Sequence, residues 1–213
     1  MTTLDLTPDE LLSTTRAVRK RLDFTRPVPD ELIRECVTLA LQAPTGSNVV
    51  TARFVVVTDQ EKRAALGEIY RDGYDKFMRS PGYPRRWKFE DAETKAQYDK
   101  MSSSAEYLGD HMGDAPALVL GCSTGPDRYS AVAGASNVLP SIWSFMLAAR
   151  ARGLGTAWTT LHALREQEIA QLLGIPYDNV AQLVMIPLAY TLGTDFKPAP
   201  RPDAEEVIHW NQW

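Results

Sequence analysis

One apolar run stands out in the chain: Val180-Ala-Gln-Leu-Val-Met-Ile-Pro-Leu-Ala-Tyr190. It lacks the regular polar alternation of a strand with one solvated face, so we expect a strand that is buried on both faces. Shorter runs at residues 53–58, 117–122 and 156–160 have a similar character and are predicted as further strands. A sheet that is apolar on both faces needs helices on both faces to cover it.

Helical patterns fill the stretches between these strands. Thr7-Pro8-Asp9-Glu10 has the form of a capping box with proline at the first helical position, and predicts a helix over residues 8–22. Pro140 should kink a long apolar helix at residues 130–152 or mark its true start. Further helices are predicted at 30–41, 59–77 and 164–173. Strands separated by helices indicate an α/β-type layering, with some antiparallel pairing.

The chain is expected to form a single domain over residues 1–213. Residues 79–90 are loop-like, and residues 90–111 suit a helix but carry too few apolar side chains to bury a face well. We therefore predict a peripheral helical excursion over about 70–111. The last segment, about 195–213, is rich in proline and ends in two tryptophans, which favours packing on a partner subunit.

Composition excludes several classes of partner. With 44% hydrophobic residues and a formal net charge of -4, the chain lacks the positive excess that nucleic-acid binding needs. It shows no signal-peptide pattern and no run of about 20 apolar residues, so we expect a cytoplasmic protein with no membrane segment. Cys36 and Cys122 lie within apolar patterns and are predicted to be core thiols.

Common site signatures are missing from the sequence. Gly153-Leu-Gly155 lacks the third glycine of a dinucleotide fingerprint, and the chain has neither a Walker loop nor a GxSxG elbow. His111, His162 and His209 lie far apart in the sequence, so no metal site is predicted. A hydrolase or a kinase therefore has little support.

Two polar motifs are candidate binding elements. Arg16-Ala17-Val18-Arg19 falls near the end of the predicted first helix, where two guanidinium groups three residues apart share a face and can grip a phosphate. The alternative is a solvated basic helix end. Residues 44–48, Pro-Thr-Gly-Ser-Asn, follow an apolar helix and offer hydroxyl and amide groups to a polar ligand, or form a plain helix-terminating turn.

These motifs, in this order, resemble those of the nitroreductase family over nearly the whole chain. The resemblance implies an α/β (α+β) fold, a three-layer α-β-α sandwich around a mixed, mainly antiparallel sheet. It implies that FMN is the cofactor, with its phosphate on the first motif. The implied flavin contacts are Arg16, Ala17, Val18, Arg19, Thr45, Ser47, Asn48, Val50, Leu139, Pro140, Ser141, Thr159, Thr160, Leu161 and Arg201.

Some of these contacts have an ordinary structural reading as well. Residues 139–141 also suit a kinked core helix, Thr159 and Thr160 suit the end of a buried strand, and Arg201 suits a solubilising tail. The chain also departs from the family pattern. Ala17 stands where a serine is typical, and residues 50–52, Val-Thr-Ala, stand where Gln-Pro-Trp is usual. The loss of an amide and of a ring predicts a wider, more apolar acceptor pocket at Ala52.

The resemblance also implies the reaction. NAD(P)H would donate a hydride to FMN and leave, and a nitroaromatic, quinone or similar acceptor would then bind, which is a ping-pong cycle. It further implies a homodimer, with the helix at residues 138–149 at the interface or, alternatively, inside an ordinary core. Two other functions remain open: a flavin-binding protein without turnover, and a flavin-dependent reductase of C=C or carbon–halogen bonds.

Overall fold

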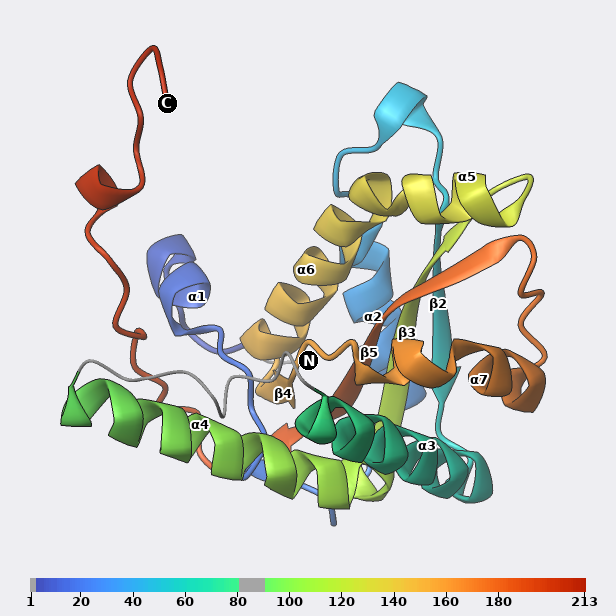
Figure 1. Cartoon of the computed structure of the whole chain (residues 1–213), viewed down its shortest axis with the longest axis horizontal. Helices are drawn as coiled ribbons and strands as arrows, with labels where there is room; N and C mark the ends of the chain where they lie inside the picture. The colour runs from blue at the N-terminus through green and yellow to red at the C-terminus, as the bar shows by residue number, and fades with distance from the viewer. Residues whose placement is uncertain (1–2, 81–90) are drawn as a thin grey trace.

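A computed structural model describes residues 3–80 and 91–213 of the chain (Figure 1). The four predicted strands and one short strand that was not predicted, β1, form one sheet in the order β1-β5-β3-β2. β4 lies off this path and pairs with β5, and all of these pairings are antiparallel. The bounds are β1 (Leu22–Asp23), β2 (Ala52–Val57), β3 (Ala117–Thr124), β4 (Leu154–Thr156) and β5 (Val180–Thr191). The apolar run at 180–190 is therefore the strand around which the sheet is organised.

Helices cover both faces of this sheet, and β5 shows why. Val184, Ile186 and Leu188 pack in one core with α2 and α6, whereas Met185 and Ala189 pack in a second core with α3 and α7. Successive side chains of a strand point to opposite faces, so one strand feeds both cores. The three-layer α-β-α class is confirmed. The helices are α1 (Pro8–Thr14), α2 (Asp30–Ala40), α3 (Gln60–Arg79), α4 (Ala92–His111), α5 (Arg128–Ala133), α6 (Ala135–Ala151) and α7 (Glu166–Leu173).

The first helix is shorter than predicted. The capping box at Thr7 and Glu10 is present, but α1 ends at Thr14 rather than near residue 22. Thr14 and Thr15 both turn their hydroxyl groups back to carbonyls of the helix, at 2.6 Å each, and Val18 then donates its N–H to Thr156 O at 2.8 Å. Pairing with β4 therefore replaces the last predicted turns of the helix.

Three other boundaries also differ from the prediction. The helix expected at 130–152 breaks at Gly134 into α5 and α6, and Pro140 lies inside α6. Glycine is a poor helix former, and here it separates the two segments. The strand expected at 156–160 pairs instead over Leu154–Thr156, with one further bridge at Thr159. A short helix, η4 (Leu161–Arg165), precedes α7.

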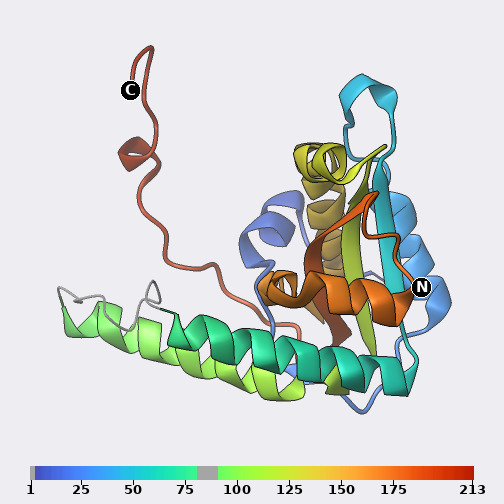
Figure 2. The ribbon, with the colours of Figure 1, turned by 45° about the vertical axis from the view of Figure 1, so that its right-hand side comes forward.

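The excursion after β2 consists of α3 and α4, which lie side by side along one edge of the molecule (Figure 2). Most of α4 is exposed, as its polar sequence predicts, but Leu108 near its end is buried in the core. Residues 81–90 of the predicted loop lie outside the described residues. Cys36 and Cys122 are buried free thiols, as predicted, and burial raises their pKa values to about 11 and about 12.

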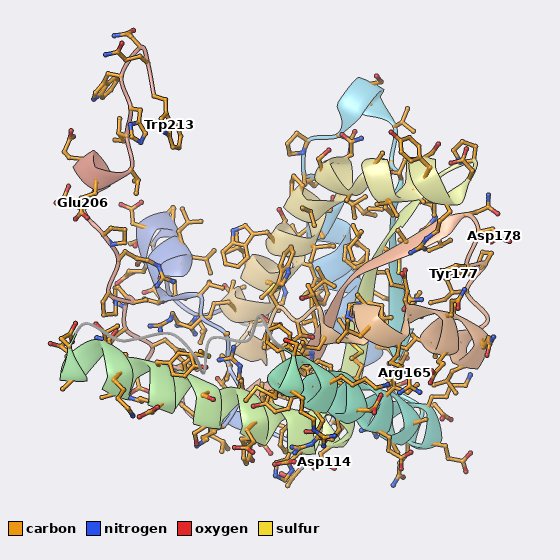
Figure 3. All side chains as sticks on the ribbon, in the orientation of Figure 1. Asp114, Arg165, Tyr177, Asp178, Glu206 and Trp213 are labelled. Carbon is orange, nitrogen blue, oxygen red and sulfur yellow. The ribbon has the colours of Figure 1, made fainter. Side chains whose placement is uncertain are left out.

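The final segment of the chain extends away from the sheet as an arm (Figures 1 and 2). Residues 197–213 are exposed almost throughout, and the side chain of Trp213 is fully exposed. A short helix, η5 (Ala204–Glu206), interrupts the arm and has its own capping box at Asp203. Figure 3 shows Glu206 and Trp213 well away from the body of the protein.

Candidate functional site

The Arg16–Arg19 segment runs beside β4 rather than on a helix. Ala17 forms a parallel bridge with Thr156, and Val18 is buried with its N–H bonded to Thr156 O. The helical spacing on which the Arg16–Arg19 pair was predicted is therefore wrong. The two guanidinium groups instead leave an extended segment that is fixed to the sheet through its backbone. Arg16 Nη1 donates to Lys197 O at 2.8 Å.

Residues 159–161 follow directly after β4 and lie close to this segment. Thr159 is buried, its Oγ1 donates to Met185 O at 2.5 Å, and its carbonyl accepts from Met185 N at 3.0 Å. Thr160 is exposed and Leu161 is half-buried. The bonds to β5 fix Thr159 in place, so this segment is preformed in a single chain.

Tyr70 on α3 connects Arg19 with Thr159. The Thr159 side chain and the Arg19 guanidinium both act on its hydroxyl and lower its pKa. Burial outweighs both effects and raises the pKa of Tyr70 to about 12, so the hydroxyl is neutral at physiological pH. Burial also lowers the pKa of Arg19, which the nearby Tyr70 partly offsets. No sequence pattern indicates this position of Tyr70, because residues 70–111 carry no recognisable motif.

Two further residues of α3 hold it against the segment that follows Thr159. A Cβ added at Gly73 would lie 2.7 Å from Leu161 O, so the helix packs directly on that carbonyl. Asp72 forms an ion pair with Arg165 of η4, which Figure 3 shows next to α3. We call residues 16–19 and 156–161 the sheet-side group. Helix α3 packs against this group.

The loop at residues 45–50 has a different character. Ser47, Asn48 and Val50 are exposed, and Thr45 is half-buried. Ser47 (φ 54) and Asn48 (φ 56) both adopt the left-handed conformation inside the short helix η1 (Gly46–Asn48). That conformation is unfavourable for a serine and more tolerable for an asparagine. The polar side chains of this loop are therefore exposed, and the backbone of Ser47 adopts an unfavourable conformation.

This loop lies against the start of α6. A Cβ added at Gly46 would lie 2.8 Å from Asn137 Oδ1. Leu139 on the same helix is 37% exposed, Pro140 is half-buried and Ser141 is buried at 1% exposure. Leu139 therefore faces outward beside the loop, whereas Ser141 points into the core. We call residues 45–50 and 137–139 the loop-side group.

The two groups lie at opposite ends of α6. Asn137 marks the loop end, whereas Arg150 Nη2 bonds to Thr14 Oγ1 at 3.3 Å at the other end, just before the Arg16–Arg19 segment. A rise of 1.5 Å per residue places positions 137 and 150 about 20 Å apart. Arg201 joins neither group, because it lies on the exposed arm and donates only to Pro200 O at 3.1 Å among the described residues.

The prediction of a wider pocket at Ala52 is wrong. Ala52 is the first residue of β2, 5% exposed, and belongs to the core that α2 and α6 share. A side chain in that position packs among the apolar residues of this core. One hollow of the described residues lies elsewhere, between residues 24–30, α3 and residues 107–116, and none of the predicted flavin contacts line it.

The sheet-side group carries cations that lack an anionic partner. Within the described part of the chain, no carboxylate lies within 4.0 Å of the guanidinium nitrogens of Arg16 or Arg19. Arg19 is also half-buried, so its charge is poorly solvated. A half-buried arginine without a carboxylate is suited to an anionic ligand such as a phosphate.

Two kinds of comparison relate the chain to known proteins, one of sequence and one of structure. A sequence profile described as "Nitroreductase family" matches residues 12–190. A Stenotrophomonas maltophilia K279a protein named NADH dehydrogenase/NAD(P)H nitroreductase is 39% identical over 74 residues, which cover 34% of this chain and 37% of that protein. The matched stretch thus spans little more than a third of that relative.

Solved structures share the fold. A crystal structure of iodotyrosine deiodinase bound to FMN and 3-iodo-L-tyrosine superposes with a TM-score of 0.73, at 22% identity, over 96% of this chain and 99% of that one. The FMN-dependent nitroreductase NfnB of Mycobacterium smegmatis, in complex with NADPH, superposes with a TM-score of 0.68, at 19% identity, over 96% and 97%. At these identities the similarity establishes the fold.

Proposed function

The chain belongs to the nitroreductase family, and from that premise we propose that it is an FMN-dependent oxidoreductase that works as a homodimer. It takes a hydride from NAD(P)H and passes it to a nitroaromatic, a quinone or a similar acceptor, with the donor leaving before the acceptor binds. The names of its relatives support this proposal, because they combine nitroreductase activity with NAD(P)H, FMN or both. The observation that carries it is the unpaired cationic pair Arg16 and Arg19.

The residues of the sheet-side group fit FMN. Arg16 and Arg19 would neutralise the phosphate, and Thr159 and Thr160 would lie along the ring system. When bound, FMN would supply the atom that accepts and returns the hydride. The chain itself would hold the phosphate, fixes Thr159 through Met185, and places Arg19 in a partly dry environment.

A second copy of the chain would complete the site. Asn137 of the loop-side group and Arg150, which contacts Thr14 just before the sheet-side group, are about 20 Å apart along α6. One small cofactor would therefore meet both groups only where two copies join. Exposed apolar side chains surround the loop and provide a surface for such contact: Val49, Val50, Val132, Leu139 and Trp143. The exposed arm, with Arg201, Trp210 and Trp213, would extend over the partner and bring Arg201 to the phosphate.

The cytoplasm is the proposed location. No helix among residues 3–80 and 91–213 is long and apolar enough to cross a membrane. Both cysteines are free and buried, which suits a reducing compartment.

The proposal is tested first by the cofactor. The purified protein should show a flavin absorbance band and bind added FMN. A charge-assisted hydrogen bond is worth about 1.5 to 3 kcal/mol, so Arg16→Ala should raise the Kd for FMN about tenfold or more. Arg34→Ala, an exposed arginine on α2, is the matched control and should leave the Kd unchanged. Protein that neither carries nor binds FMN would contradict the proposal.

Turnover and assembly are tested separately. Steady-state oxidation of NADH and NADPH with a nitroaromatic and a quinone should show parallel-line kinetics, whereas bound FMN without NAD(P)H oxidation would indicate a flavin-binding protein without turnover. Sedimentation should show a dimer at micromolar concentration. Deletion of residues 195–213 should weaken the dimer and FMN binding together. A truncated chain that stays dimeric with full FMN content would show that the arm has no part in either.

A further inference from the structure

The arm leaves the body through a compact root, which we define as residues 192–197. Leu192 N donates to Arg21 O at 2.8 Å, and Arg21 Nε donates to Leu192 O at 2.9 Å. Arg21 Nη1 and Nη2 reach Asp195 O at 3.2 Å and Asp195 Oδ1 at 2.7 Å. The root is thus tied to the same N-terminal segment that carries Arg16 and Arg19.

Phe196 in this root lies close to two guanidinium groups. Arg21 Cζ lies 4.2 Å from the ring centroid, and Arg150 Cζ lies 4.8 Å from it. Both distances are typical of cation–π contacts. The ring therefore contacts both the N-terminal segment and the end of α6, and it holds the root between them.

The burial of Arg150 opposes the position of the root seen in this structure, which we call the closed form. It is 4% exposed, and its only hydrogen bonds among the described residues are from Nη2 to Thr194 O at 3.0 Å and to Thr14 Oγ1 at 3.3 Å. Nε and Nη1 have no hydrogen-bond partner there, and no carboxylate of the described residues pairs with the group. Burial, and to a smaller degree Arg21, lower the pKa of Arg150. Opening the root would return this cation to water, so the closed form is only moderately favoured.

We propose that Phe196, Arg21 and Arg150 form a latch at the root of the arm, and that a phosphate bound at Arg16 tightens it. Arg16 Nη1 already donates to Lys197 O at 2.8 Å, the residue next to Phe196. A guanidinium has five N–H donors, so Arg16 can hold this carbonyl and a phosphate together. A bound phosphate restrains Arg16 and, through it, Lys197.

The consequence is a linkage between cofactor and assembly. If FMN favours the closed latch, the closed latch favours FMN by the same factor. A root held in one direction also presents the arm to a second copy with less loss of conformational freedom. This linkage rests on the proposed function, whereas the latch itself does not.

Chymotrypsin can report on the latch directly, because the bond between Phe196 and Lys197 is cleavable only when the ring leaves its seat. The full-length protein is digested with and without saturating FMN, and the fragment ending at Phe196 is followed by mass spectrometry. All variants are compared at one protein concentration and in the same oligomeric state, checked by sedimentation. FMN should slow this cleavage about threefold to tenfold in the unmodified chain.

Arg21→Met removes the ring contact and the bonds to the root, and should speed cleavage at Phe196 about tenfold. Asp195→Asn, at a largely exposed side chain that does not endanger folding, should speed it about twofold to threefold. Arg152→Met, at the residue that follows α6 and pairs with Glu35, is the matched control and should leave the rate unchanged. Equal rates in all four proteins would overturn the latch.

The linkage between FMN and the latch can be contradicted separately from the latch itself. If FMN binds, as its own absorbance shows, and cleavage at Phe196 is unaffected, the linkage is overturned while the latch stands. If FMN does not bind to any of the proteins, the proposed function fails, and the rates of the Arg21→Met and Asp195→Asn variants alone decide whether the latch exists.

Discussion

The sheet-side and loop-side groups are built on opposite principles. The sheet-side group is fixed by backbone pairing to β4 and β5, and α3 packs on it so closely that Gly73 meets the Leu161 carbonyl. The loop-side group is exposed, contains two residues with positive φ, and meets only the flexible side chain of Asn137 at Gly46. The first group is held by contacts within one chain, whereas most of the second is exposed in the single chain.

The largest expected effect concerns the sheet-side group and is a loss of folding stability at low pH. His162 follows Leu161 directly and is fully buried, and burial lowers its pKa to about 4, more than the nearby Gln182 backbone and Glu166 raise it. The unfolded chain binds this proton below about pH 6.5 and the folded chain only below about pH 4, so stability falls as pH drops through that window. The expected loss is about 3 kcal/mol.

Urea unfolding at several pH values between 7.5 and 4 measures this loss. His162→Leu should flatten the dependence on pH even if it lowers stability at neutral pH, and His209→Gln on the exposed arm should not alter it. The same slope in His162→Leu and the unmodified protein would show that another group causes the acid sensitivity.

Gly73→Ala should have the next largest effect. The new methyl group would meet Leu161 O at 2.7 Å, and neither the helix nor the backbone carbonyl can give way cheaply. Overpacking of this kind costs about 2 kcal/mol. Urea unfolding and FMN titration measure the change, and affinity for FMN should fall along with stability. A variant of normal stability would show that α3 moves freely over the sheet-side group.

Tyr70→Phe should have a smaller effect, because it keeps the buried ring and removes only the hydroxyl between Arg19 and Thr159. Loss of the polar interactions of one hydroxyl group costs about 1 kcal/mol, which corresponds to roughly a fivefold weaker affinity for FMN. Tyr177→Phe, on the loop before β5, is the control. A shift in the flavin reduction potential would accompany a positioning role, whereas a loss of stability alone would indicate that Tyr70 only fills the core.

The sequence predicts the framework of this molecule better than its site. The apolar run at 180–190 and the capping box at Thr7 encode their structures locally, so pattern alone finds β5 and the start of α1. The end of α1 depends on Val18 pairing with Thr156, which is distant in sequence. Tyr70 likewise meets Thr159 only in the folded chain. Motif resemblance places the candidate residues, but it does not show that they divide into a group fixed to the sheet and a group in and beside an exposed loop.

Gly46→Ala tests the loop-side group and should have the smallest effect on stability. The new methyl group would lie 2.8 Å from Asn137 Oδ1, almost as close as the contact at Gly73, but the neighbour here is the end of an exposed side chain that can rotate away. Gly46 does not have a positive φ, so alanine adds no backbone strain. Stability by urea unfolding should therefore change by less than about 0.5 kcal/mol, and the double variant Gly46→Ala/Asn137→Ala should be no different. If Gly46→Ala instead costs as much as Gly73→Ala, and Asn137→Ala restores the loss, then Asn137 is locked in place, and the loop-side group is as rigidly formed in one chain as the sheet-side group.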